Sequence, residues 1–216
     1  MNYHQLQTAE LQPPPDFSSV AQQFQKQPAK LHLLHGHSGV FTVGLIIGSA
    51  SQQPIAVIDG ATRFNSYTLS KVAAYLGIPA KALLHRTHVT RSFTAFQTEA
   101  AITTKLPSFL ATHQCRIVVI LGLLDTYYDE QVKPYECLKS LQRIVNTLKE
   151  LVKQNIHVLI ADIEVADPPK GKENLFKLVK DAADDVAILE INENGFRLKG
   201  ENNYGTKQRY IHARHR

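Results

Sequence analysis

The chain has no tryptophan, one methionine and two cysteines among its 216 residues. Cys115 and Cys137 are too few for a disulfide framework or a four-cysteine zinc site, and free thiols are typical of a reducing cytosol. The apolar stretch 40–56 is interrupted by glycine, serine and glutamine, so it falls short of the roughly 20 apolar residues that cross a bilayer. The first residues lack the cationic and apolar regions of a secretory signal. We therefore expect a cytoplasmic protein that makes no membrane contact.

A lysine is also missing where a phosphate-binding loop is expected. Residues 31–42 read LHLLHGHSGVFT, an apolar run followed by a glycine turn and a helix-compatible stretch, which is the order that nucleotide phosphates require. A working loop reads Gly, four residues, then Gly-Lys-Ser/Thr. Counted from Gly36, the last three places hold Phe41, Thr42 and Val43. The candidate nucleotide-binding residues are Gly36, His37, Ser38, Gly39, Val40, Phe41 and Thr42.

The net charge of +5 permits an anionic partner without identifying one. Residues 207–216 contain four lysines and arginines and no carboxylate, which suits a phosphate backbone. The alternative is a basic tail that only keeps the protein soluble. The candidate nucleic-acid contacts in this tail are Arg209, Arg214 and Arg216.

Composition divides the chain into three parts. Residues 1–30 are rich in glutamine and proline and lack a sustained apolar period, which indicates an arm or linker. Residues 31–212 alternate between apolar runs and helical patterns and form the expected core domain, and residues 213–216 are a basic tail. The expected strands are mostly uniform apolar runs: 30–35, 54–59, 83–90, 116–121, 157–162 and 186–192. The expected helices lie at 66–76, 93–113 (interrupted by Pro107), 135–154 and 172–183.

This alternation predicts an α/β fold with a mainly parallel sheet and helices on both faces, in which ligands bind beyond the carboxyl ends of the strands. Residues 195–199 and 208–212 flank a segment rich in asparagine and glycine. They predict a C-terminal hairpin of two antiparallel strands.

The order of these motifs resembles the ATPase core of RecA-like recombinases, and within it the branch of archaeal RadA and its eukaryotic relatives. After the glycine loop, residues 58–64 (IDGATRF) are similar to that branch's strand-end motif IDTEGTF. Residues 91–97 (RSFTAFQ) resemble the family's Arg-Ala-Phe/Tyr segment, which ends in His-Gln. The apolar run 117–122 stands where the Walker B strand is expected. The resemblance implies a three-layer RecA-like P-loop NTPase fold that binds ATP or ADP with Mg²⁺. Lys170 and Lys172 follow a strand at the place where recombinases carry a DNA-contacting loop, so the resemblance makes them candidate DNA contacts.

Three departures from the family pattern fall on catalytic positions. The loop lysine corresponds to Thr42, or to Phe41 if the loop is one residue shorter. The catalytic glutamate corresponds to Ala61, and the Walker B aspartate corresponds to Gly122. Asp125 is the nearby carboxylate that could substitute as a magnesium ligand. Because phosphoryl transfer depends on positioning and charge stabilisation, these losses predict a protein that does not turn over ATP.

Histidines near the loop allow two further interpretations. His35 and His37 could share one face of a strand, whereas His85 and His88 lie on opposite faces of the predicted strand 83–90. Without cysteine or carboxylate ligands nearby, a metal site is not expected. We also consider that His37 or Arg63 supplies the missing positive charge to a bound phosphate.

A His-Gly segment of this kind also occurs in the oxyanion hole of α/β-hydrolases. The chain contains no Gly-x-Ser-x-Gly nucleophile elbow, which argues against a hydrolase.

Three functional hypotheses follow. The first is a catalytically degenerate pseudo-ATPase that acts as an accessory factor in DNA recombination or repair. It would bind single- or double-stranded DNA, a recombinase-like partner or copies of itself. The second is a divergent DNA-dependent ATPase, and the third is a structural or regulatory interaction module that binds no nucleic acid.

Overall fold

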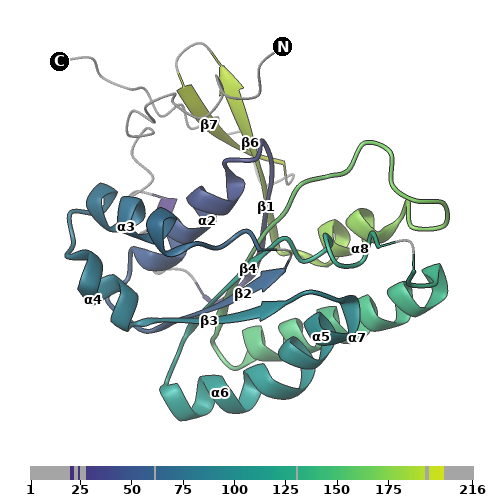
Figure 1. Cartoon of the computed structure of the whole chain (residues 1–216), viewed down its shortest axis with the longest axis horizontal. Helices are drawn as coiled ribbons and strands as arrows, with labels where there is room; N and C mark the ends of the chain where they lie inside the picture. The colour runs from purple at the N-terminus through teal and green to yellow at the C-terminus, as the bar shows by residue number, and fades with distance from the viewer. Residues whose placement is uncertain are drawn as a thin grey trace.

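The computed structural model describes residues 20–21, 24, 28–60, 62–129, 131–192 and 195–201. Its strands form one seven-stranded sheet in the order β3-β2-β4-β5-β1-β6-β7 (Figure 1). Strands β1 to β6 run parallel, and β7 is antiparallel to β6. The strands are β1 (Leu31–Gly36), β2 (Ile55–Gly60), β3 (Thr87–Ser92), β4 (Ile117–Leu121), β5 (His157–Ala161), β6 (Asp185–Asn192) and β7 (Gly195–Gly200).

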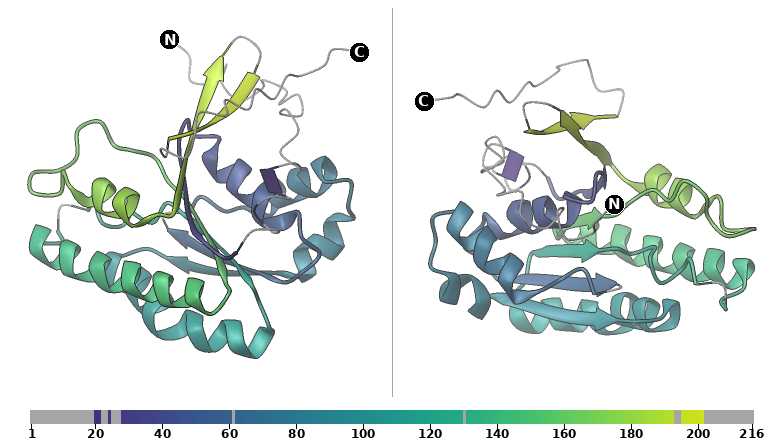
Figure 2. Two further views of the ribbon diagram at one scale, coloured as in Figure 1. Left: turned by 180° about the vertical axis from the view of Figure 1, so that it is seen from behind. Right: turned by 45° about the horizontal axis from the view of Figure 1, so that its top comes forward.

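Helices cover both faces of the sheet (Figures 1 and 2). One face packs against α2 (Val40–Ser49), α3 (Ser66–Tyr75) and α4 (Ala80–His85). The other packs against α5 (Ala95–Ala100), the π-helical turn η2 (Ala101–Lys105), α6 (Leu106–His113), α7 (Pro134–Lys153) and α8 (Leu175–Ala182). The alternating strand residues divide between the two cores, so the uniformly apolar strands are buried on both sides. The expected α/β architecture with a mainly parallel sheet is confirmed.

Two of the expected elements need correction. Residues 83–90 are not one strand, because α4 continues to His85 and β3 begins only at Thr87. Pro107 does not interrupt the helix 93–113, since it occupies the first turn of α6, where a missing backbone N–H is tolerated. The irregular part of that helix is the π-helical turn before it.

The antiparallel part of the sheet also differs from expectation. β7 forms a hairpin with β6, with Leu189 opposite Leu198 and Ile191 opposite Phe196. Residues 208–212, which the sequence analysis paired with this strand, lie outside the described residues, as do the tail 213–216 and most of the arm 1–30. Among the helices that the structure describes, none combines the length and apolarity needed to cross a membrane.

One residue of the N-terminal arm, Phe24, packs on a pair of histidines. Its ring centroid lies 4.8 Å from that of His32 on β1 and 5.0 Å from that of His157 on β5. Within the described part of the chain, Nε2 of His32 and Nδ1 of His157 are buried without a hydrogen-bond partner. Burial lowers the pKa of His32 to about 4, against an opposing contribution from Asp185, and burial also lowers the pKa of His157. Both rings are therefore neutral at pH 7.

Acidification is expected to destabilise the protein through His32. The pKa of His32 lies below its unfolded value of 6.5, so the unfolded chain binds more protons between pH 6.5 and pH 4, and stability falls as the pH drops through that window. At pH 5.5 the loss is about 1 kcal/mol relative to pH 7.5. Denaturant unfolding of the wild type and His32→Gln at both pH values measures it, with the exposed His85→Gln as control. Equal pH dependence in all three proteins would contradict the assignment.

Candidate functional site

The direction of winding of the sheet reverses between β1 and β5. The chain leaves β1 into α2 on one face of the sheet and leaves β5 towards α8 on the other. In open parallel sheets, ligands bind beyond the carboxyl ends of the strands at such a reversal of direction. The glycine loop that follows β1 lies at this position, so the structure places it where the sequence analysis expected a ligand.

The loop between β1 and α2 is short and hydrogen-bonded to itself. Gly36 adopts φ +109, and three residues then lead directly into α2. The N–H of Gly39 donates to Nδ1 of His37 at 3.1 Å, and the N–H of Val40 donates to the His37 carbonyl at 2.9 Å. A phosphate-binding loop points such N–H groups at its ligand. Here both N–H groups donate to His37 instead, one to its imidazole and the other to its carbonyl oxygen.

The C-terminal hairpin covers the same loop. The N–H of His37 donates to the carbonyl of Leu189 on β6 at 2.9 Å. A Cβ atom on Gly39 would lie 3.0 Å from the ring of Phe196 on β7, and that ring lies 5.7 Å from the imidazole of His37. The hairpin therefore occupies space directly over the turn.

The first turn of α2 is filled by an aromatic ring. Phe41, one of the two residues aligned with the family's lysine, is buried, and the guanidinium carbon of Arg63 lies 5.0 Å from its ring centroid. Nε of Arg63 donates to Oδ2 of Asp125 at 2.8 Å. The structure thus joins Arg63, which could have met a phosphate, to Asp125, which could have held magnesium, in one ion pair.

Gly122 follows β4 in a conformation that a side chain disfavours. Its φ is +63, and a Cβ atom would lie 2.7 Å from Oδ2 of Asp125 and 2.8 Å from the carbonyl oxygen of Gly60. The ends of β2 and β4 approach each other too closely for an aspartate here. Ala61, aligned with the catalytic glutamate, lies outside the described residues.

Two buried carboxylates at this edge were not given a role by the sequence analysis. Asp59, at the end of β2, is fully buried, and its Oδ1 accepts hydrogen bonds from the N–H groups of Arg63 (2.7 Å) and Phe64 (3.0 Å). Its Oδ2 lies 3.2 Å from Nε of Arg91. Asp59 therefore fixes the segment that carries Arg63. The sequence feature that could have identified Asp59 is its position as a carboxylate at the end of an otherwise apolar strand.

The second carboxylate, Asp162, comes directly after β5. It accepts hydrogen bonds from the N–H of Leu124 at 2.9 Å and from its neighbour Ile163 at 2.8 Å. Burial raises its pKa to about 7, despite these two hydrogen bonds. Burial, with the nearby charge of Asp162, also raises the pKa of Tyr128 to about 12. Asp162 ties the connection after β4 to the end of β5.

The candidate DNA contacts have different surroundings. Lys172 is buried, and its ammonium group donates to the carbonyl oxygens of Tyr127 (2.9 Å) and Asp129, so it is not exposed to a nucleic acid in this structure. Lys170 is exposed, and its role as a DNA contact stays a prediction. The remaining three, Arg209, Arg214 and Arg216, lie outside the described residues.

The histidines take part in separate interactions. Nε2 of the buried His35 lies 3.0 Å from the Glu201 carboxylate, which Lys180 also contacts. His88 packs against Phe109 and His113, whereas His85 ends α4. Nowhere in the described ranges do three or more His, Cys, Asp or Glu side chains gather in a way that could hold a metal ion.

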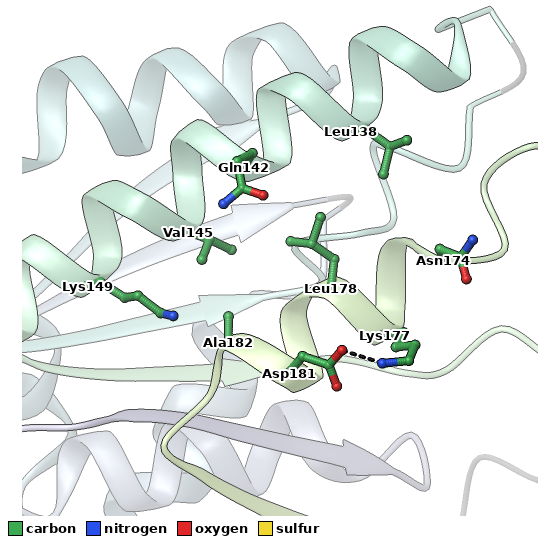
Figure 3. A pocket seen from close by; sticks show the side chains of 9 residues that line it. All are labelled: Leu138, Gln142, Val145, Lys149, Asn174, Lys177, Leu178, Asp181 and Ala182. Atoms are coloured by element: carbon green, nitrogen blue, oxygen red, sulfur yellow. Dashed lines mark hydrogen bonds and ion pairs between the residues drawn. The ribbon is translucent and has the colours of Figure 1, made fainter.

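Two surface hollows lie away from the loop. A groove of about 410 Å³ separates α7 from α8, where Leu138 and Val145 face Leu178 and the Lys177–Asp181 ion pair lies at one side (Figure 3). A second hollow of about 480 Å³ lies between β3 and the η2–α6 segment. Neither of these two hollows is lined by any residue of the segment 36–42.

No protein-family model matches the chain, and no curated protein is significantly similar to it in sequence.

Proposed function

We propose that this protein is a catalytically degenerate RecA-like factor that assists DNA recombination or repair without hydrolysing ATP. The family assignment is supported by the order of its motifs and by a mostly parallel sheet that places the glycine loop after β1. The accessory role follows from keeping such a scaffold while the ATP chemistry is lost.

The observation that carries this proposal is the closed glycine loop. The N–H groups that would bind phosphate already bond to His37, and Phe196 packs over Gly39. A triphosphate would have to displace both contacts and would still meet no lysine. Since a hydrogen bond to a charged group contributes roughly 1.5 to 3 kcal/mol, each missing donor lowers affinity by about one to two orders of magnitude.

An open sheet edge supports the partner side of the proposal. Among the described strands β3 pairs only with β2, so its other edge presents backbone groups without a strand beside them. Val89 and Thr90 on this strand are exposed. An extended segment of a recombinase-like partner, or of a second copy of the chain, could add to such an edge through backbone hydrogen bonds.

A phosphate-release assay with the purified full chain, with and without single-stranded DNA, tests the loss of catalysis. We expect no release above background at saturating ATP and Mg²⁺. Turnover of about one per second, within the range of ordinary enzymes, would overturn the proposal. Asp125→Asn is the matched variant, because activity from this site depends on that carboxylate whereas a contaminating ATPase does not.

Calorimetric titration with ATP and ADP tests the closed loop itself. The wild type is expected to show no saturable heat at micromolar concentrations. His37→Ala removes the side chain that accepts from Gly39 and leaves the Phe196 contact with Gly39 in place. Micromolar binding by the wild type would favour the divergent ATPase hypothesis instead. Stronger binding by His37→Ala alone would show that His37 closes the site.

A further inference from the structure

The described part of the N-terminal arm packs on the sheet at the amino-terminal ends of β1 and β5. Val20, Ala21 and Phe24 have helical backbone geometry, Ala21 and Phe24 are buried, and Val20 packs against the same apolar cluster. His32 is the second residue of β1, and His157 is the first residue of the parallel strand β5. The Phe24 ring contacts both imidazoles. The arm therefore occupies a surface at the opposite end of β1 from the glycine loop.

Phe24 packs over two imidazole nitrogens that have no hydrogen-bond partner among the described residues. These atoms are Nε2 of His32 and Nδ1 of His157, and both are buried. A neutral imidazole can leave one nitrogen as an unused lone pair. An imidazolium carries an N–H on both nitrogens, so it would bury a donor and a positive charge without an acceptor. The docked arm therefore fits neutral histidines and disfavours protonated ones.

The charged groups around the histidine pair do not offset this cost. Nδ1 of His32 lies 3.5 Å from the carboxylate of Asp185, but the ammonium group of Lys30 pairs with the same carboxylate at 3.0 Å. The carboxylate of Asp184 accepts a hydrogen bond from a backbone N–H of β1. The neighbouring His157 opposes a positive charge on His32. Burial outweighs the attraction of the two aspartates, so the pKa of His32 in the docked state is about 4.

The arm is the layer over the histidines that can move without opening the sheet. Strand β1 pairs with β5 and β6, and β5 also pairs with β4, so both histidines lie on interior strands. In the described part of the arm, the fully or nearly fully buried side chains are those of Ala21 and Phe24. An opening that breaks so few buried contacts costs less than unfolding an interior strand. Movement of Phe24 would give water access to both nitrogens.

We propose that the N-terminal arm is a pH-sensitive strap, docked through Phe24 on neutral His32 and His157 and released when these histidines are protonated. Release leaves the sheet folded and exposes the histidine pair together with the apolar side of the arm. Because the docked state has the lower pKa, docking is fully favoured above the ordinary His32 value of 6.5 and weakens as the pH falls towards 4. If release restores the ordinary value, the docked-to-released ratio at pH 5.5 is about tenfold lower than at pH 7.5.

Native-state hydrogen exchange on the full chain tests this strap. Peptides that contain residues 20–24 should lose protection about tenfold between pH 7.5 and pH 5.5, after correction for intrinsic exchange rates. Low urea concentrations should leave their exchange unchanged, because local release exposes little surface. The amides of β4, which is buried throughout, should respond strongly to urea. His32→Gln should remove most of the pH dependence, whereas the exposed His85→Gln should behave like the wild type.

Phe24→Ala tests the same coupling from the arm and keeps both histidines. If Phe24 shields the pair from water, its removal should bring the pKa of His32 closer to 6.5, as measured by NMR titration of the imidazole signals. Residues 20–24 of this variant should lose protection at both pH values. An unchanged pKa of His32 in Phe24→Ala would overturn the strap, because the arm would then have no influence on the histidines.

Two results of the exchange experiment would also overturn the strap. Protection of residues 20–24 that does not change with pH in the wild type would show that docking does not depend on the histidines. The same urea dependence for the arm and for β4 would show that the arm is released only when the whole chain unfolds. These measurements involve neither ATP nor DNA, so their outcome leaves the proposed function to its own tests.

Discussion

Replacing Gly122 with alanine is expected to lower the free energy of unfolding by about 3 kcal/mol. A side chain at φ +63 costs about 1–2 kcal/mol, and forcing an extra carbon into a packed region costs about 1–3 kcal/mol more. The new Cβ would lie 2.8 Å from the carbonyl oxygen of Gly60 and 2.7 Å from Oδ2 of Asp125. Denaturant unfolding of the purified variant, analysed at constant slope, measures the loss.

Gly77 provides a matched control for this substitution. It has nearly the same backbone angle, φ +66, but no atom lies within 4 Å of the place where its Cβ would be. Gly77→Ala is therefore expected to cost only the conformational part, about 1 kcal/mol. Equal losses at the two positions would mean that the contact between the ends of β2 and β4 makes no contribution.

The same geometry bears on an aspartate at position 122, where the family resemblance expects the Walker B carboxylate. Gly122→Asp would add a second carboxylate beside Asp125 as well as the steric conflict with Gly60. We expect it to be less stable than Gly122→Ala and to gain no ATPase activity. Its unfolding curve and a phosphate-release assay check both expectations.

The sequence predicted the strands well because both faces of the sheet are buried. Runs such as 117–121 are apolar throughout, and they became strands within a residue or two of the expected bounds. The prediction of one strand over residues 83–90 failed because apolar residues followed by histidines fit a short helix and a strand equally well. Tertiary packing decides between them: Thr87–Ser92 pairs with β2, whereas Leu83 belongs to the buried apolar cluster on the face that α2 and α3 cover.

The glycine turn after the first strand could be located from the sequence, but its contacts could not. The spacing after Gly36 indicated a glycine turn beyond the first strand, and the structure places one there. The closing contacts involve residues far apart in the chain, since Phe196 and Leu189 reach the loop from the hairpin, and Asp125 meets Arg63 across 62 positions. Residue types alone do not encode such pairings. The sequence showed that no lysine follows the glycine turn. It did not show that Arg63 packs on the buried ring of Phe41 at that position.

A buried carboxylate gives the second large effect, a dependence of stability on pH through Asp162. Burial raises the pKa of this side chain from 3.8 to about 7. The folded state therefore binds more protons than the unfolded state between those values, so the stabilising contribution is present at low pH and is lost as the pH rises through 7. Between pH 5.5 and pH 8 the contribution falls by about 2 kcal/mol.

Asp162→Asn separates this effect from the opposing titration of His32. Asparagine stays neutral at every pH and keeps one oxygen acceptor for the N–H groups of Leu124 and Ile163, so it loses one hydrogen bond, at about 1 kcal/mol. The wild type minus variant difference in unfolding free energy should be about 2 kcal/mol larger at pH 5.5 than at pH 8. The exposed Asp167→Asn, from the same segment, should leave the pH dependence unchanged. Parallel pH curves for wild type and Asp162→Asn would show that Asp162 is ionised throughout. Its two backbone hydrogen bonds would then outweigh the cost of burying its charge.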